Sequence, residues 1–180
     1  GNTYFNETEA FNGSTWTEVN DTNLTRRLSM ASGTQNAAFI ATGITDTPSV
    51  ALTQVTEEWN GDIWTSVGNT VATKVFGSSG GTQNAGIIFG GSVDGGVGNA
   101  HGTTETYDGT SWTERNDMNV SRQAVGGSGT QNAAVVFGGQ NPSSNTHAST
   151  EEWNGTSWSV VNGLPTAQRS ADGAGSQAAA

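Results

Sequence analysis

Tryptophan recurs along this chain at a nearly constant interval. Spacings of 48, 48 and 46 residues separate four of its six tryptophans, Trp16, Trp64, Trp112 and Trp158. Another aromatic residue stands five positions before each of them, at Phe11, Trp59, Tyr107 and Trp153. A period of this length is typical of repeated units that each bury an apolar face against the next unit. We therefore expect these eight aromatic side chains to pack between neighbouring units.

Each unit contains signals for four short antiparallel strands. Asn-Gly or Asp-Gly lies between the paired aromatics and favours a tight hairpin with a type I′ turn, in which both central residues have positive φ. A Thr-Gln-Asn-Ala element joins a second, glycine-rich pair of strands, whose glycines suit a crowded inner position. A long loop follows that pair, at 44–53, 92–102 and 140–148. No segment has the period of an amphipathic helix.

These signals predict an all-β chain, a β-propeller of four-stranded antiparallel blades. Complete blades are expected at about 26–67, 74–115 and 122–161, with half blades at 1–20 and 169–180. This makes a single propeller, or a propeller segment, of about four blade equivalents. The two halves either complete one split blade and close a minimal ring, or they belong to a longer propeller or a symmetric homo-oligomer.

The unit also resembles a kelch repeat, the unit of galactose-oxidase-like propellers. It shares the apolar strand, the Gly-Gly pair at Gly90-Gly91 and Gly138-Gly139, the variable loop, Glu before an aromatic, a short turn, Trp and then a basic residue. The first copy departs from this pattern, with Thr42-Gly43 in place of Gly-Gly. The segment T-E-E-W-N-G-T-S-W at 150–158 is similar to segments of highly regular kelch-like proteins predicted in marine bacteriophage genomes. Some kelch-like propellers are copper oxidases with a cysteine-linked tyrosine, and the absence of cysteine excludes that chemistry here.

Composition narrows the classes of partner. The formal charge of −10 argues against nucleic acid, because phosphate binding needs a basic footprint. No apolar run approaches the roughly 18–20 residues of a membrane helix, so we expect no membrane insertion. Low aliphatic content would suggest disorder, but only 12% of residues are charged and the tryptophans are evenly spaced, so we expect a folded chain. No cofactor or metal is expected.

The basic residues repeat with the blade. Four of the six open the predicted inner strands, ten or eleven residues after a tryptophan, at Arg26, Lys74, Arg122 and Arg169. In a closed ring they would form a cationic circle able to bind a carboxylate or sulfate. Alternatively, each pairs with a repeat acid such as Glu57, Glu105 or Glu151, or with backbone carbonyls.

The long loops hold the other candidate ligand-binding residues. His101 and His147 each precede a repeat glutamate by four positions and are interpreted either as a metal pair or as exposed loop residues. Asp46 and Asp94 offer carboxylates for a weak Ca²⁺ site, although no dense calcium loop is present. Asn141 opens the third loop and is a further candidate.

Catalysis has little support, because two loop histidines do not make a nucleophile–base pair. The leading hypothesis is a non-enzymatic recognition module on a virion or extracellular surface, such as a phage tail fibre, that binds host glycans or another structural protein through the loops. The second is a structural scaffold that contacts protein neighbours in a larger assembly. The third is a segment of a glycan-processing enzyme.

Overall fold

A computed structural model describes residues 6–45, 51–94 and 97–179. Apart from two single-turn 3-10 helices, η1 (Val97–Asn99) and η2 (Gln177–Ala179), their regular structure consists of β-strands. Every pairing between these strands is antiparallel. The prediction of an all-β chain is therefore confirmed.

Three four-stranded sheets form the body of the molecule, and we call each a blade. The first blade consists of β4 (Met30–Thr34), β5 (Ala37–Ala41), β8 (Thr56–Trp59) and β9 (Trp64–Val67). The second consists of β10 (Ser78–Thr82), β11 (Ala85–Phe89), β12 (Thr104–Tyr107) and β13 (Trp112–Arg115). The third consists of β14 (Gly126–Thr130), β15 (Ala133–Phe137), β16 (Thr150–Trp153) and β17 (Trp158–Val161).

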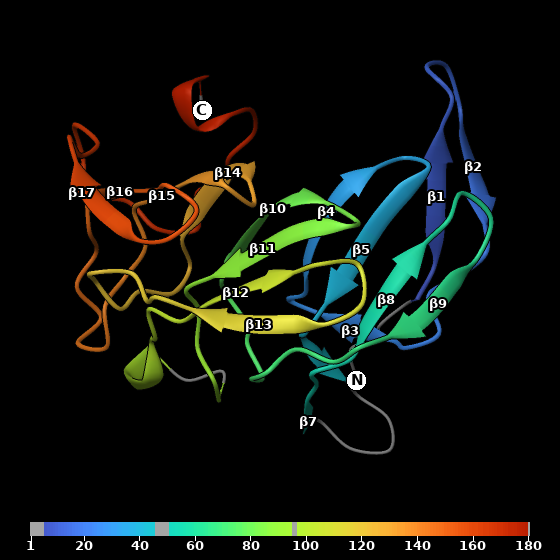
Figure 1. The fold of residues 1–180 in the computed structure, drawn as a ribbon, viewed down its shortest axis with the longest axis horizontal. Coiled ribbons are helices and arrows are strands. Elements are labelled where there is room, and N and C mark those ends of the chain that lie inside the picture. Colours follow the sequence, from blue (N-terminus) through green and yellow to red (C-terminus); the bar gives the residue numbers. More distant parts are fainter. Residues whose placement is uncertain (1–5, 46–50, 95–96, 180) are drawn as a thin grey trace.

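Two smaller sheets complete the structure. One is the hairpin of β1 (Thr8–Phe11) and β2 (Trp16–Val19), and the other joins β3 (Arg26–Arg27), β6 (Ile44–Thr45) and β7 (Ala51–Leu52). The blades follow one another along a curved row, with the β1–β2 hairpin at one end and the C-terminal segment at the other (Figure 1). Each blade is thus flanked by the next along the chain, as the repeat requires.

The outer hairpin of each blade closes differently from the prediction. In the second blade Tyr107 pairs with Trp112, which leaves a four-residue loop at 108–111. Only Gly109 has a positive φ there, of 89°, whereas a type I′ turn needs two such residues. The Asp108 carboxylate accepts hydrogen bonds from the backbone N–H groups of Thr110 and Ser111, at 2.9 and 2.8 Å, and these bonds lower its pKa. The predicted hairpin is present, but the predicted turn type was wrong because a side chain organises the loop.

The innermost strands β4, β10 and β14 lie side by side across the three blades. They approach so closely that a Cβ added at Gly80 would lie 2.8 Å from the carbonyl oxygen of Gly129. The Ser78 hydroxyl also crosses between blades and donates to the carbonyl of Gly127 at 3.1 Å. Glycine and serine are therefore required here by the close approach of neighbouring backbones.

The hydrophobic core lies between blades rather than within one. Between the first and second blades, the ring of Trp112 packs edge-on against Phe39, with ring centroids 5.5 Å apart. Between the second and third, Trp158 packs against Phe89 at 5.1 Å in the same way. Both indole N–H groups donate across the interface to a threonine hydroxyl of the preceding blade. A blade without a neighbour consequently leaves its aromatic residues in solvent.

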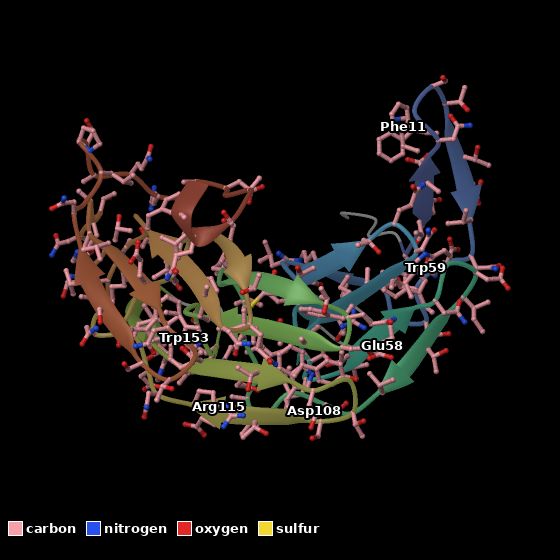
Figure 2. The ribbon with its side chains drawn as sticks, turned by 45° about the horizontal axis from the view of Figure 1, so that its top comes forward. Phe11, Glu58, Trp59, Asp108, Arg115 and Trp153 are labelled. Carbon is pink, nitrogen blue, oxygen red and sulfur yellow. The ribbon has the colours of Figure 1, made fainter. Side chains whose placement is uncertain are left out.

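That situation occurs at the β1–β2 hairpin. Trp16 is 66% exposed and Phe11 is 43% exposed, although both occupy positions predicted to pack between units. Figure 2 shows Phe11 on a hairpin that extends beyond the first blade, whereas Trp59 and Trp153 lie within the curved row. The local sequence matches the other units, but no described residues cover this face.

Candidate functional site

A buried ion pair lies in each of the three blades. It joins a basic residue, four positions before the innermost strand, to a glutamate on the third strand. The pairs are Arg26 with Glu57, Lys74 with Glu105 and Arg122 with Glu151. The N–O distances are 2.9 Å in the second blade and 2.8 Å in the third. The six side chains are at most 1% exposed. Each pair therefore connects the inner half of its blade to the outer half.

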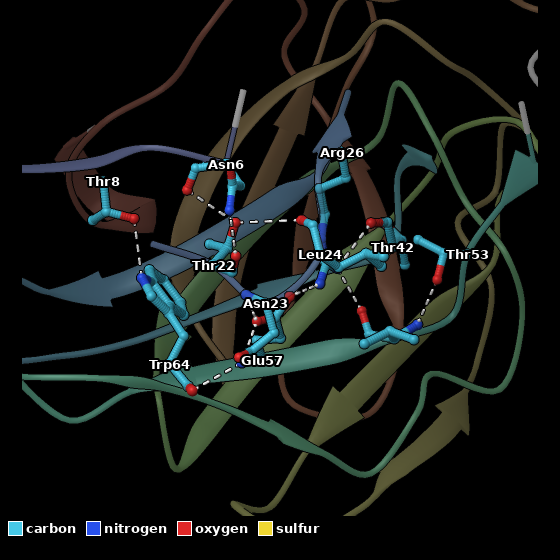
Figure 3. Close-up of polar contacts among 11 residues, drawn as sticks. Asn6, Thr8, Thr22, Asn23, Leu24, Arg26, Thr42, Thr53, Glu57 and Trp64 are labelled. Carbon is cyan, nitrogen blue, oxygen red and sulfur yellow. Dashed lines mark hydrogen bonds and ion pairs between the residues drawn. The ribbon is translucent and has the colours of Figure 1, made fainter. Parts of the chain in front are cut away.

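Further hydrogen bonds complete each ion pair. In the first blade Arg26 also donates to the carbonyl of Thr42 at 3.2 Å (Figure 3). It donates to the carbonyl of Val55 as well, at 2.6 Å. The second carboxylate oxygen of Glu57 accepts from the backbone N–H and the side-chain amide of Asn23, at 2.6 and 2.9 Å. In the other blades the backbone N–H groups of Val71 and Asn119 take the same role. The buried charges are thus held by several polar partners.

Burial has the largest effect on the pKa of each of the three cations. Removal from water lowers the pKa of Arg26, Lys74 and Arg122, and the adjacent glutamate opposes this shift in each blade. These side chains do not form an exposed cationic circle in the described chain. The sequence also allowed each of these cations to pair with a repeat acid or with backbone carbonyls, and the structure shows both kinds of contact.

Arg169 differs from the other three basic residues. Gln168, not Arg169, occupies the position of Arg122. The Gln168 carbonyl accepts a hydrogen bond from the backbone N–H of Gly139 at 2.8 Å, just as the Arg122 carbonyl accepts one from the N–H of Gly91 at 2.8 Å. Arg169 lies one residue further on, is exposed, and donates to the side-chain oxygen of Gln140 at 2.6 Å. The predicted grouping of four cations fails here because this backbone register places a neutral residue at the repeat position.

The long loops share two backbone anchors. At the start, the amides of Gly43, Gly91 and Gly139 donate to a carbonyl of the next unit. At the end, the amides of Thr53, His101 and His147 donate back to the carbonyls of those same glycines, at 3.0, 2.7 and 2.9 Å. Figure 1 shows β7 and η1, which belong to two of these loops, along one edge of the molecule. The scaffold therefore presents three different loop sequences from equivalent positions.

The two histidines lie at these loop ends rather than at the tips. Both are half-buried, and the backbone carbonyl of each accepts a hydrogen bond from the start of the following unit. The Nε2 atom of His147 is buried without a hydrogen-bond partner in the structure. Within the described ranges, no group of three or more His, Asp or Glu could hold a metal ion. The geometry therefore gives the histidines a structural position and gives no support to a metal pair.

Two other loop candidates shape their own loops. The Asp94 carboxylate accepts hydrogen bonds from Ser92 and Asn99. The side-chain oxygen of Asn141 accepts from the backbone N–H groups of Ser143 and Asn145, both at 3.0 Å. Asp46 lies outside the described residues. Asp94 and Asn141 therefore determine loop conformation, and any contact they make with a ligand stays a prediction.

The glutamine of the Thr-Gln-Asn-Ala element links adjacent blades. Gln83 donates to the carbonyls of Ala38 and Trp59, at 3.3 and 2.8 Å. Gln131 and Gln177 each make the same two bonds to the preceding blade. The recurrence of this residue in the sequence was the available signal, but its role depends on how blades face each other.

Antiparallel four-stranded sheets in a curved row, with their cores between sheets, define a β-propeller-like fold. Comparison with solved structures agrees with this class. The structure of YjhT superposes with a TM-score of 0.76 at 8% identity, over 93% of this chain and 65% of that chain. This chain thus spans just under two thirds of the length of that protein, and the likeness concerns the fold alone.

No protein-family model and no curated protein sequence matches the chain. No helix among the described residues is long and apolar enough to cross a membrane.

Proposed function

We propose that this chain is part of a kelch-type propeller that recognises its target through the long loops, on a virion or another extracellular surface. The common anchoring of the three loops is the observation that supports this function. Equivalent glycines start the loops and equivalent backbone amides end them, while the sequences between differ. A constant scaffold with variable loops is an arrangement that proteins use for recognition.

The exposed groups of the third loop indicate the chemistry of the target. Residues 142–146 are all exposed, and they offer hydroxyl and amide groups without a formal charge. The chain as a whole carries a charge of −10, which disfavours polyanionic partners. Neutral glycan hydroxyls therefore fit this surface better than sulfated or phosphorylated ligands.

A binding role fits the described acids better than glycan processing does. Glu57, Glu105 and Glu151 are buried in ion pairs, so their carboxylates have no access to a substrate. Asp94 is engaged by its own loop. These contacts support the proposal of a module that binds its target without catalysing a reaction.

Binding to an array of neutral and acidic oligosaccharides tests this function. One variant replaces residues 142–146 with Gly-Ser residues, and a control variant carries Thr156→Ala in the exposed turn between β16 and β17. We expect the parent and the control to bind the same neutral glycans and the loop variant to lose at least tenfold in affinity. Equal binding by the loop variant and the parent would exclude recognition through this loop.

A structural scaffold, such as a component of a phage tail or surface appendage, is the second candidate. The exposed aromatic residues of the β1–β2 hairpin favour it, because a large apolar surface of this kind is typical of protein contacts. Cross-linking in the source assembly separates the two candidates: protein neighbours at the loop edge support the scaffold, and free loops support recognition.

A further inference from the structure

The β1–β2 hairpin repeats the outer half of a blade, down to its glutamate. Phe11 pairs with Trp16 as Trp59 pairs with Trp64, so Glu9 holds the position of Glu57 on the third strand. The indole N–H of Trp64 donates to the Thr8 hydroxyl at 3.1 Å, as the corresponding tryptophans donate in the other blades. By position, Glu9 is therefore the counterpart of the three glutamates in the buried ion pairs.

Among the described residues, the other half of that blade is not found beside Glu9. In each complete blade a strand of the inner pair covers the edge of the third strand, whereas β1 pairs only with β2 among the described residues. A cavity of about 400 Å³ lies beside this edge, with Phe11, Trp16 and Gln35 in its lining. The side-chain amide of Gln35 donates one hydrogen bond, to the Phe11 carbonyl, where the side-chain amide of Gln83 donates two. In the other units the second acceptor is a carbonyl of the inner strand that pairs with the third strand.

The charge of the absent segment follows from the repeat. Glu57, Glu105 and Glu151 each bind an arginine or lysine that stands four residues before the innermost strand. Glu9 is exposed, and among the described residues its carboxylate has no ion pair or hydrogen bond. Covering this edge without a cation would bury the carboxylate unpaired, which is strongly unfavourable. The segment that covers β1 must consequently bring a basic residue.

The C-terminal segment of this chain contains Arg169 but has no cation at the required position, one residue earlier. Gln168 stands at the position of Arg122, so the ion pair would be lost. Pro165 stands at the position of Asn119, whose backbone N–H donates to Glu151, and proline has no N–H to donate. A second copy would offer the same two defects.

We propose that the free edge of β1 binds a β-hairpin of the inner-strand type that carries an arginine or lysine four residues before its first strand. Residues 164–180, from this chain or from a second copy, are not that hairpin. The added strand would form backbone hydrogen bonds with the free edge of β1. Its apolar side chains would fill the cavity, and its cation would form an ion pair with Glu9, so a hairpin without a cation would bind more weakly.

A peptide of residues 117–139 contains Arg122, β14 and β15 and serves as the probe. Its affinity for the chain is measured by fluorescence anisotropy, next to the same peptide with Arg122→Gln. We expect the Arg122→Gln peptide to bind at least tenfold more weakly, and a peptide of residues 164–180 to bind no better than that.

Two variants of the chain assign the preference to one carboxylate. Glu9→Gln should bind both 117–139 peptides equally, whereas Glu18→Gln, which changes the residue paired with Glu9 across the hairpin, should keep the preference for arginine. Glu9 and Glu18 are both exposed, so both variants should fold.

The proposal is overturned if the parent peptide does not bind at millimolar concentration, if Glu9→Gln keeps the preference, or if the 164–180 peptide binds as tightly as the 117–139 peptide. None of these outcomes bears on glycan binding by the loops, which are separate from this edge.

Discussion

The hairpins β1–β2 and β16–β17 share the same sequence pattern but have different surroundings. Both pair two aromatic residues across a four-residue loop, Phe11 with Trp16 and Trp153 with Trp158. Trp158 is 5% exposed whereas Trp16 is 66% exposed. The hairpin therefore forms from local signals, since backbone pairing and the turn lie within about a dozen residues, but its burial depends on the inner strands and on the neighbouring blade.

The glutamates show the same contrast with a larger energetic effect. Glu151 is buried beside Arg122, and Glu9 is exposed without a partner among the described residues. A motif that repeats in sequence can thus contribute very different amounts to stability, and substitutions at equivalent positions measure the difference.

The largest effect is expected from Glu151→Gln. Removing this carboxylate leaves the Arg122 charge buried without its counterion, which should cost about 3–5 kcal/mol of unfolding free energy. The matched variant Glu9→Gln should change stability by less than about 0.5 kcal/mol, as is usual for exposed sites. Urea denaturation of the two variants measures both values. Similar losses would mean that Glu9 is already paired in solution.

A smaller contrast is expected for Trp158→Phe and Trp16→Phe. The indole N–H of Trp158 donates to the buried Thr104 hydroxyl at 2.8 Å, so its loss should cost about 1–3 kcal/mol. Trp16→Phe should leave stability within about 0.5 kcal/mol of the parent, because this ring is 66% exposed and none of the described blades surrounds it. Thermal unfolding followed by circular dichroism compares them. A clear loss in Trp16→Phe would show that something covers the hairpin.

The smallest effect is expected from Tyr107→Phe, and it depends on pH. The Tyr107 hydroxyl donates to the Glu58 carboxylate at 2.7 Å, a bond worth about 1 kcal/mol at neutral pH. Burial and the adjacent carboxylate raise the pKa of Tyr107 well above its ordinary value of about 10.

The sign of the pH dependence follows from that raised pKa. Above about pH 10 the unfolded chain releases the tyrosine proton while the folded chain retains it, so the contribution of Tyr107 to stability is present below that pH and falls as pH rises. The stability difference between the parent and Tyr107→Phe should therefore narrow from pH 9 to pH 11 in urea titrations. A constant difference over that range would contradict the raised pKa.

Much of the architecture could be predicted because the repeat is local and strongly periodic. Paired aromatics, Asn-Gly or Asp-Gly turns and glycine-rich pairs predicted antiparallel strands, and the structure confirms an all-β chain with a propeller-like arrangement. The turn type was wrong because the Asp108 side chain bonds to the loop backbone, an interaction that the Asp-Gly pair alone does not reveal.

The candidate site was harder to predict because it depends on contacts between distant residues. Arg26 and Glu57 are 31 positions apart, and only the packed blade shows whether such a cation faces solvent or a buried acid. Arg169 was grouped with the other cations by its spacing, but backbone bonding gives that position to Gln168. The count from each tryptophan, ten residues in three units but eleven to Arg169, was the available signal for this one-residue difference.

By itself, the sequence determined the four blade strands of each unit and their order, since hairpin formation depends on residues close together in the chain, but it did not predict the small sheet of β3, β6 and β7. It also determined which positions are aromatic, acidic or basic. The tertiary structure decided which of those side chains are buried, which cation meets which carboxylate and which edge stays open. The physical reason is that every core and every ion pair here joins separate strands or blades, so its existence depends on what lies next to it in space.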